Sequence, residues 1–597
     1  MSEPKNREEI EEKYKWKLSD IFPSDEAFES AFENVRKTAA EFASFEGKLA
    51  SGAVTLKKAL DELCEINENL LSVAAYACMH RDEDNEVSKY RAMADRVGDL
   101  ESEVMEASSF LEPEIISAGK ETVEKYMEEC EELSEYRQFF HNLFREAEHI
   151  LDEKSEKLLA ATMPMGGASH DVFSAMNNAD IRFGKIKGEN GEEEELTHSR
   201  YGIFLESGNR EVRKAAYEAM YAQYKGFKNT FAAMYAGSVK SDLFYAKTKK
   251  FPSTLLMKLS GSFIPESVYA KLVEDVNEGI DELSGYLELR KKILGVSGLC
   301  MYDLYVPIVP EDEGDIPYEE ACEMVLKAVA PLGEAYVNDM RRAFSERWVD
   351  VFENRGKTSG AYSWGDNRNH PFVLMNYQGK IEDVFTLAHE MGHAMHSYYT
   401  NKTQPSVYRD YKIFVAEVAS TVNENLLLEY LLRDAKGTRR AYLLGRKLEA
   451  IRTTFYRQTM FAEFEKKAHG AYSEGTPLTA ETLCDMYGKV NKKYYGKVCE
   501  CDENISYEWA RIPHFYTSFY VYQYATGFAA ATRIKELVLS DGKNADAYME
   551  FLKSGSSDYP LNLLKSAGVD LEDGTAVRSV VNDMKTATDE LKLLLDK

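Results

Sequence analysis

The sequence is poor in the residues that interrupt helices. It contains 15 prolines and 36 glycines among 597 residues, and no Gly-, Ser- or Pro-rich linker divides it. Proline and glycine are the strongest helix breakers, so their scarcity favours long helices with short connections. Hydrophobic residues recur at helical spacing after Pro23 and again from Ser88, which is typical of amphipathic helices. The sequence therefore predicts a mainly α-helical protein.

Features of exported and membrane-spanning proteins are also lacking. The eight cysteines are scattered, and the closest two, Cys499 and Cys501, do not have the spacing of a CxxC redox or zinc motif. No stretch approaches the roughly 18 uncharged apolar residues of a membrane span. The N-terminal segment contains no apolar region typical of a secretory signal. We therefore expect a reduced, cytoplasmic protein that does not interact with membranes.

Basic residues are in the minority. The chain has 73 Lys and Arg against 101 Asp and Glu, a formal charge of −28. Sequence-independent binding to nucleic acid or to anionic membranes needs basic patches, so neither is an expected partner. The hydrophobic content of 44% and the aromatic content of 12% are ample for a large buried core, which excludes a disordered chain.

Two segments break the helical pattern. Residues 179–201 alternate and predict two short strands joined by a polar, glycine-containing turn. Residues 359–380 contain a predicted strand, PFVLMNY, directly before a cluster of histidines. We expect a small β-sheet beside the histidine-bearing helix, whose strand edge can hold an extended peptide. A boundary near residue 200 divides the predicted N-terminal helical lobe, 1–200, from a catalytic lobe, 201–597.

The histidine cluster reads TLAHEMGHAMH over residues 386–396. His389 and His393 are four residues apart, so on a helix they project from one face, and two imidazoles at this spacing can bind one zinc ion. Glu390 lies about 100° around the helix, within reach of a water beside the metal. HExxH supplies all three parts of a metallopeptidase site. The alternative is a pair of ordinary core histidines, but small Gly392 permits a close approach and favours the metal site.

The third metal ligand must come from elsewhere, since a catalytic zinc usually has three protein ligands. His396 lies about 10.5 Å along the helix axis from His389, so it is predicted to pack or to support a ligand rather than to bind the metal. The following amphipathic segment, FVAEVASTVNENLL, offers Glu417 and Glu424. Residue chemistry leaves the choice between them open, and the other glutamate could orient a ligating imidazole.

Several segments together resemble the oligoendopeptidase F family, relatives of thimet oligopeptidase among the HExxH zinc peptidases. They are GAYSW, HPFVLMNYQG, DVFTLAHEMGHAMH, FVAEVASTVNENLL, RIPHFYTSFYVYQYATG and, near the start, YKWKLSDIFPSDEAFE. The resemblance runs from about residue 14 into the last third of the chain. It implies a helical, two-lobed ellipsoid split by a deep substrate channel, with one Zn²⁺ per chain at its floor.

The resemblance also implies roles for individual residues. The zinc ligands would be His389, His393 and Glu417, with Glu390 as the general base. With Glu417 as a ligand, Glu424 is expected to orient a ligating imidazole, and His396 is expected to pack beside the ligands or to support one of them. A second group from RIPHFYTSFYVYQYATG would donate hydrogen bonds to the oxyanion and the substrate backbone; it consists of His514, Tyr520 and Tyr524. The residues expected to bind the extended substrate are Gly360, Ala361 and Tyr362.

The expected function is that of a zinc-dependent oligoendopeptidase that hydrolyses internal bonds of short, unstructured peptides. One alternative is an HExxH carboxypeptidase, which should need a cation to hold the free C-terminus of its substrate. The other is a non-catalytic peptide-binding or chaperone-like protein on the same fold. The intact set of predicted ligands and base argues against the second alternative.

Overall fold

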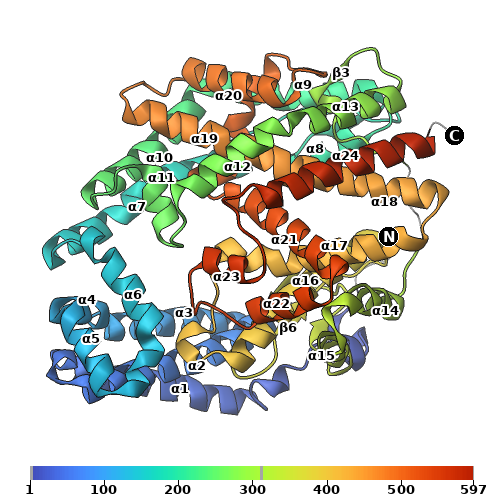
Figure 1. The fold of residues 1–597 in the computed structure, drawn as a ribbon. Helices are drawn as coiled ribbons and strands as arrows, with labels where there is room; N and C mark the ends of the chain where they lie inside the picture. The colour runs from blue at the N-terminus through green and yellow to red at the C-terminus, as the bar shows by residue number, and fades with distance from the viewer. Residues whose placement is uncertain (1–4, 310–313, 596–597) are drawn as a thin grey trace. The chain divides into compact units, whose positions relative to one another are not determined.

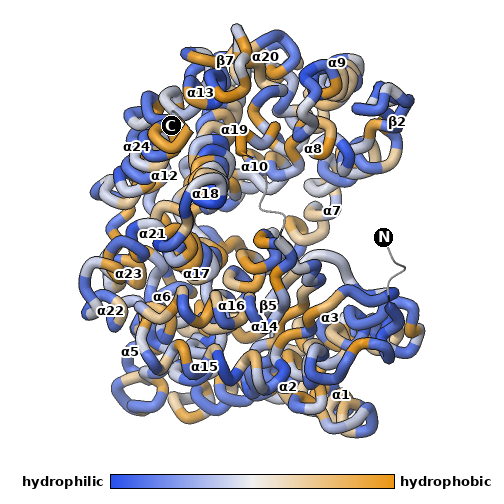
Figure 2. Tube along the Cα trace, turned by 90° about the vertical axis from the view of Figure 1, so that its right-hand side faces the viewer, coloured by the Kyte–Doolittle hydropathy of each residue, from blue (hydrophilic) through white to orange (hydrophobic). Residues whose placement is uncertain are grey.

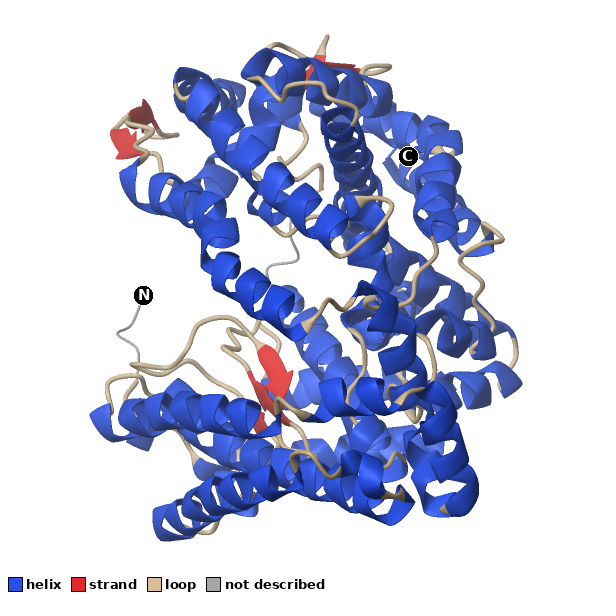
Figure 3. Cartoon of the chain, turned by 90° about the vertical axis from the view of Figure 1, so that its left-hand side faces the viewer, coloured by secondary structure: helices blue, strands red, loops and turns tan. Residues whose placement is uncertain are grey.

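The computed structural model of the chain describes residues 5–309 and 314–595. Over these residues helices dominate, and the strands are few and short (Figures 1 and 3). The prediction of a mainly α-helical protein with small sheets is confirmed. No helix among the described residues is long and apolar enough to cross a membrane, and the cysteines, all in described segments, are free thiols.

The chain forms two compact units, and each is assembled from three segments. Unit 1 comprises Met1–Glu148, Glu313–Tyr430 and Ile534–Gly568, and unit 2 comprises His149–Asp312, Leu431–Arg533 and Val569–Lys597. Two helices, α17 (Ile413–Asp434) and α21 (Tyr522–Ser540), each begin in one unit and end in the other. The division into lobes near residue 200 and the deep substrate channel, both expected from the sequence, stay predictions.

Unit 1 is built largely of amphipathic helices, on which Figure 2 shows hydrophobic and hydrophilic residues side by side. In α1 the Ser24 side chain caps the first turn by accepting a hydrogen bond from the Ala27 N–H, and Phe28 and Phe32 are fully buried one turn apart. Besides α17 and the end of α21, the α-helices of this unit are α1 (Asp25–Phe42), α2 (Ala53–Glu83), α3 (Ser88–Ser108), α4 (Leu111–Ala118), α5 (Lys120–Glu129), α6 (Arg137–Glu146), α14 (Tyr318–Ala328), α15 (Glu334–Ser345), α16 (Ile381–Thr403), α22 (Lys543–Leu552) and α23 (Pro560–Ser566).

Unit 2 is also helical, and it contains two π-helical segments, η8 (Met176–Asp180) and η12 (Ile451–Tyr456). Two 3-10 helices, η13 (Asn504–Arg511) and η14 (Pro513–Tyr516), lead into α21. The α-helices of this unit are α7 (Glu153–Ala175), α8 (His198–Glu206), α9 (Arg210–Gly226), α10 (Lys228–Thr248), α11 (Thr254–Ser260), α12 (Glu266–Glu278), α13 (Ile280–Leu294), α18 (Gly437–Ala450), α19 (Arg457–Ser473), α20 (Ala480–Tyr495) and α24 (Thr575–Leu595).

Both segments predicted to contain strands do so. In unit 2, β1 (Lys185–Lys187) and β2 (Glu193–Glu195) form an antiparallel hairpin around a turn in which Gly191 has a φ of 79°. The same unit contains a short parallel pair, β3 (Leu299–Cys300) and β7 (Cys499–Glu500). In unit 1, β4 (Val349–Asp350), β6 (Phe372–Leu374) and β5 (Tyr362–Trp364) form a three-stranded sheet in the order β4-β6-β5.

This three-stranded sheet positions the histidine-bearing helix. The side chains of Phe372 and Leu374 on β6 are fully buried and join the hydrophobic core made largely by α1 to α6. The chain then turns at Gly379, whose φ of 83° favours glycine. Asp383 accepts hydrogen bonds from the backbone N–H groups of Gln378 and Lys380, both at 2.9 Å, which satisfies donors at the start of α16. Both β5 and β6 contact α16, so the predicted sheet beside the HExxH helix is confirmed.

Candidate metal centre and a second group of polar side chains

Helix α16 brings the two histidines of the HExxH motif together. The Nε2 atoms of His389 and His393 are 3.2 Å apart, as expected for side chains one turn apart on the same face. The helix is fixed by the buried side chains next to them, since Leu387, Ala388 and Met391 have no exposed surface. The imidazoles therefore project from a helix that is anchored in the core of unit 1.

Helix α17 crosses α16 at Gly392. A Cβ atom at this glycine would lie 2.6 Å from the Ala419 carbonyl oxygen and from the Ser420 Cα, so only glycine permits this approach. A hydrogen bond from the Asn423 side-chain amide to the Ala388 carbonyl oxygen, at 3.2 Å, joins the helices one turn further on. The small residues on both helices thus bring the side chains of α17 within reach of the histidines.

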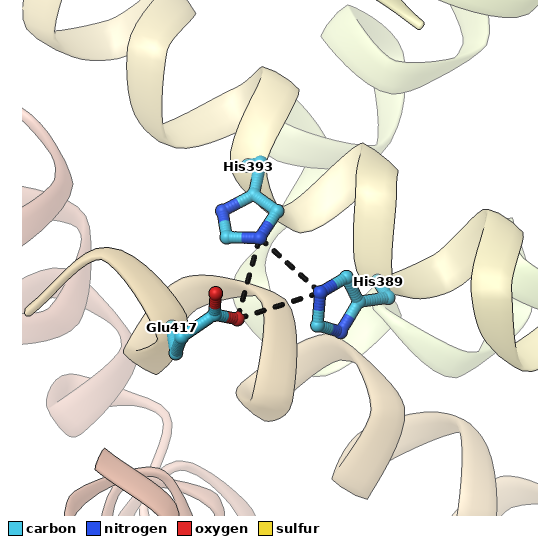
Figure 4. Close-up of side chains that lie close together, drawn as sticks. All are labelled: His389, His393 and Glu417. Atoms are coloured by element: carbon cyan, nitrogen blue, oxygen red, sulfur yellow. Dashed lines mark hydrogen bonds and ion pairs between the residues drawn. The ribbon is translucent and has the colours of Figure 1, made fainter. Parts of the chain in front are cut away.

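Glu417 is the side chain on α17 that meets both imidazoles. Its Oε2 atom lies 3.4 Å from the Nε2 atoms of His389 and His393, and Figure 4 shows the three groups pointing toward one another. The Ser420 hydroxyl donates to the same oxygen at 3.0 Å. Burial opposes ionisation of Glu417, but the two histidines and this hydroxyl lower its pKa to about 2, so the carboxylate is charged.

Glu424, the other candidate on α17, contacts the opposite nitrogen of the first histidine. Its Oε1 atom accepts a hydrogen bond from His389 Nδ1 at 2.7 Å. Burial opposes a charge on His389, but Glu424, Glu390 and Glu417 together raise its pKa to about 9. The three carboxylates therefore make the surroundings of His389 strongly favourable for a positive charge. The contact with Glu424 also fixes the orientation of the His389 ring.

The distances among the three converging groups fit a small tetrahedral cation. Such an ion with bonds of about 2.1 Å separates its ligand atoms by about 3.4 Å. The observed separations are 3.2 Å between the two nitrogens and 3.4 Å from each nitrogen to the carboxylate. Among the residues the structure describes, His389, His393 and Glu417 are the group of potential ligands that meets the geometric requirement for a metal ion. Two nitrogens and one carboxylate oxygen are the donor set that zinc accepts in catalytic sites.

Glu390 lies beside the cluster on the same helix. Its side chain is largely buried, at 7% exposed. Burial raises the pKa of its carboxyl, and the nearby histidines oppose that rise. A carboxyl whose pKa is raised toward neutrality can both accept and return a proton.

The predicted substrate-binding residues lie on and just before the edge strand β5. Gly360 has a φ of 85°, and the Asn376 side-chain amide donates to its carbonyl oxygen at 2.8 Å. Ala361 follows, and Tyr362 begins β5, where its hydroxyl donates to Asp82 on α2 at 2.9 Å. Strand β5 pairs with β6 on one side and has no strand partner on the other among the described residues. Its second edge can therefore pair with an extended chain.

The second predicted group lies in unit 2, where the structure brings its three members together. The Tyr524 hydroxyl and the His514 Nε2 atom are 3.4 Å apart. The Tyr520 ring lies parallel to the imidazole at 6.3 Å and edge-on to the Tyr524 ring at 5.4 Å between centroids. Burial and the charge of Arg457 lower the pKa of His514, so its ring is neutral at pH 7 and Nε2–H or the tyrosine hydroxyls can donate.

Two residues absent from the predictions hold this second group in place. Asp242 on α10 accepts a hydrogen bond from the Ser518 hydroxyl at 2.5 Å. Glu465 on α19 accepts the Phe519 N–H at 3.0 Å, and Phe519 has a φ of 59°, which is unusual for a residue with a bulky side chain. Burial raises the pKa of Glu465 to about 8. No sequence motif marks either acid. At the metal centre, the hydrogen bond from Ser420 to Glu417 was also not predicted, and the small residues around Ser420 were its only sequence signal.

His396 is part of the core. It is 1% exposed, and its ring stacks on Tyr411 at 3.8 Å and lies 5.4 Å from the ring of Phe551 on α22. Burial lowers its pKa to about 3, so the ring is neutral. Of the two roles offered by the sequence for His396, packing or support of a ligand, these contacts correspond to packing.

A helical fold with an HExxH pair and a glutamate from the following helix defines a class of metallopeptidases. Residues 203–581 match peptidase family M3, and residues 114–183 match the family described as oligopeptidase F. Oligopeptidase PepF of Bacillus subtilis is 44% identical over 99% of this chain and 89% of its own length. The chain belongs to peptidase family M3, and it is a metallo-oligopeptidase.

Solved structures agree with this assignment. The crystal structure of oligoendopeptidase-F from Enterococcus faecium is 36% identical, covers 96% of this chain and 99% of its own, and has a TM-score of 0.73. A crystal structure from Chlamydophila abortus is 31% identical, covers 99% of this chain and 100% of its own, and has a TM-score of 0.94. The fold is therefore shared over nearly the whole length.

Proposed function

We propose that this protein is a zinc-dependent oligoendopeptidase that cleaves internal bonds of short, unstructured peptides in the cytoplasm. The convergence of His389, His393 and Glu417, with Glu390 beside them, carries the proposal. The relatives support the substrate class, since those from B. subtilis and E. faecium are an oligopeptidase and an oligoendopeptidase.

In this proposal the three converging residues hold one Zn²⁺. When bound, the ion supplies a Lewis acid that polarises the scissile carbonyl and makes a nearby water more acidic. Glu424 holds the His389 ring in place through its contact with Nδ1. Glu390 accepts a proton from the attacking water at its carboxylate and then donates it to the leaving amine. The raised pKa of Glu390 suits the second of these transfers.

The edge of β5 is the proposed substrate platform. An extended peptide would add to this edge through backbone hydrogen bonds near Gly360, Ala361 and Tyr362, which requires no particular side chain. Such binding favours unstructured peptides, because a folded protein does not offer a free strand. Since β5 contacts α16, a peptide held there lies next to the helix that carries Glu390.

His514, Tyr520 and Tyr524 are the proposed donors to the oxyanion and the substrate backbone. They supply neutral N–H and O–H groups within one cluster, which is what stabilisation of a developing negative charge requires. For this role the cluster must reach the same peptide as Glu390 does.

The test uses an internally quenched peptide of about ten residues, blocked at both ends. Zinc-loaded wild type, chelator-treated wild type and Glu390→Gln are compared. We expect internal cleavage by the wild type, with loss on chelation, recovery with zinc, and a fall of about 10²–10⁴-fold in kcat for the variant despite normal zinc content. Cleavage only of peptides with a free C-terminus would identify a carboxypeptidase instead. Zinc binding without any turnover would indicate a peptide-binding protein.

A further inference from the structure

A small cavity inside unit 2 is lined by three arginines. Its volume is about 20 Å³, enough for one water molecule or one monatomic ion. Arg452, Arg457 and Arg511 form part of its wall, and Glu508 is the one acidic side chain among the described residues that line it. The cavity lies where η12, α19, α20 and η13 meet, and it shares no residue with the candidate metal centre, which belongs to unit 1.

Positive charge is in excess around this cavity. Glu508 pairs with both Arg457, at 2.6 Å, and Arg511, at 3.4 Å. Glu449 likewise pairs with both Arg452, at 2.6 Å, and Arg290, at 3.1 Å. Four guanidinium groups thus share two carboxylates.

Three of these six groups are removed from water. The side chains of Arg290 and Arg452 are 1% exposed, and that of Glu508 is 4% exposed. Arg457, Arg511 and Glu449 are partly exposed, at 19%, 21% and 32%. Burial opposes ionisation of Glu508, but Arg457 and Arg511 hold its pKa below the ordinary value. Glu508 is therefore already charged and cannot neutralise any further arginine charge. Unbalanced charge in a buried site is costly.

Two donors at the cavity have no partner. The Arg511 Nε and the Tyr495 hydroxyl are buried and make no hydrogen bond to any described residue, and both side chains line the cavity. Tyr495 is 2% exposed, and burial raises the pKa of its phenol, so the hydroxyl keeps its proton and can donate. Buried donors are almost always satisfied in folded proteins. These two groups can therefore donate to an occupant of the cavity that accepts hydrogen bonds.

We propose that this cavity binds a single halide ion, with chloride as the natural occupant. An anion satisfies the two free donors and offsets the excess of guanidinium charge at once. A water molecule would satisfy the donors and leave the charge unbalanced, while an oxyanion such as phosphate or sulfate is too large for the volume. The site is separate from the proposed peptidase site, because none of its residues is a proposed metal ligand, base or hydrogen-bond donor to the substrate, although the charge of Arg457 acts on the pKa of His514.

The proposal predicts that halide stabilises the folded protein, since a ligand that binds only the folded state raises its stability by mass action. Thermal unfolding of the full-length, zinc-loaded chain is followed in sodium chloride, sodium bromide and sodium gluconate at matched ionic strength. We expect a saturable rise of the melting temperature with chloride and bromide that gluconate does not produce. Equal melting temperatures in all three salts would overturn the proposal.

Tyr495→Phe removes one of the two free donors and keeps the ring. We expect the half-saturating halide concentration to rise about tenfold, the loss of one hydrogen bond to a charged group. Tyr548→Phe is the matched control, because Tyr548 is also buried with an unpartnered hydroxyl but lies on α22 in unit 1. An unchanged halide response in Tyr495→Phe, or an equal change in both variants, would contradict the assignment.

Crystals of the wild type grown in bromide give a direct test that needs no variant. We expect one anomalous scattering peak within hydrogen-bond distance of Arg511 Nε and the Tyr495 hydroxyl. Density of a water without anomalous signal at this position would show that water fills the cavity and would overturn the proposal.

Discussion

The two groups of candidate site residues are built in different ways. His389, His393 and Glu417 stand on two long helices, and their spacing follows from the helical repeat and from the close contact at Gly392. His514 and Tyr520 stand on a short 3-10 helix and the turn after it. In that turn Ser518 and Phe519 are held by Asp242 and Glu465, which are 276 and 54 residues away from them in sequence. The two histidines are therefore set by local geometry, whereas Glu417 depends on one helix crossing and the second group depends on contacts between segments far apart in the sequence.

The largest effect should come from breaking the first group. Glu417→Ala removes the charged oxygen that both imidazoles face, so we expect metal affinity to fall by more than the roughly 100-fold typical of a supporting residue and peptide cleavage to fall below detection. Metal content after dialysis and cleavage of the blocked peptide measure this. Full metal occupancy in the variant would show that Glu417 is not a ligand.

The second group should affect turnover without affecting the metal. Tyr520→Phe and Tyr524→Phe each remove one hydroxyl, and the one that donates to the oxyanion should lower kcat about 10²–10³-fold. Zinc content should stay at the wild-type level in both. If kcat is unchanged in both variants, the group has no role in the transition state.

A smaller effect on metal affinity is expected for Glu424, the residue of α17 that orients His389 on α16. Glu424→Gln keeps a hydrogen bond to His389 Nδ1 but removes the charge, so we expect metal affinity to fall about 10–100-fold. Turnover at saturating zinc should be largely retained. Glu429→Gln, on the same helix and paired with Lys535, is the matched control and should keep wild-type affinity. Equal affinities in the two variants would remove Glu424 from the site.

The smallest effect concerns the acid that holds Phe519. The pKa of Glu465 is about 8 in the folded protein, above the value of about 4.3 in an unfolded chain. The folded state therefore binds one more proton between these values, so the contribution to stability is full below about pH 4 and is lost as pH rises to 8, by at most about 1.4 kcal/mol per pH unit. Urea unfolding between pH 6 and 8 should show a weaker pH dependence in Glu465→Gln than in the wild type.

A variant of an exposed glutamate at the end of the same helix, Glu474→Gln, should follow the wild type in this experiment. In Glu465→Gln the new side-chain amide oxygen can still accept the Phe519 N–H, so turnover should change little. Identical pH profiles for all three proteins would show that Glu465 is ionised in the folded state.

Much of the fold could be predicted from the sequence because its signals are local. Scarce proline and glycine and helical periodicity predicted the helices, and alternation predicted β1, β2 and β6. The i, i+4 spacing of His389 and His393 predicted their convergence. Local chemistry could not choose between Glu417 and Glu424, because that choice depends on where α17 crosses α16; the resemblance favoured Glu417, and it is Glu417 that faces both imidazoles.

The remaining features depend on contacts that leave no local pattern. Asp242 and Glu465 are single acids on ordinary helices, and their importance follows only from Ser518 and Phe519 lying against them. The assembly of each unit from three separate segments also has no signal in composition, since no linker marks the points where the chain passes between units.

The interleaved chain has a consequence for synthesis on the ribosome. Helix α16 is complete once residue 403 has been made, yet α22, which supplies Phe551 against His396 and the Leu552 carbonyl oxygen to Thr400, is made only after about 140 further residues. Domains generally fold as units during synthesis, from the N-terminal end onward. Unit 1 cannot do so, and the side of the HExxH helix that carries His396 and Thr400 stays uncovered until most of unit 2 has emerged.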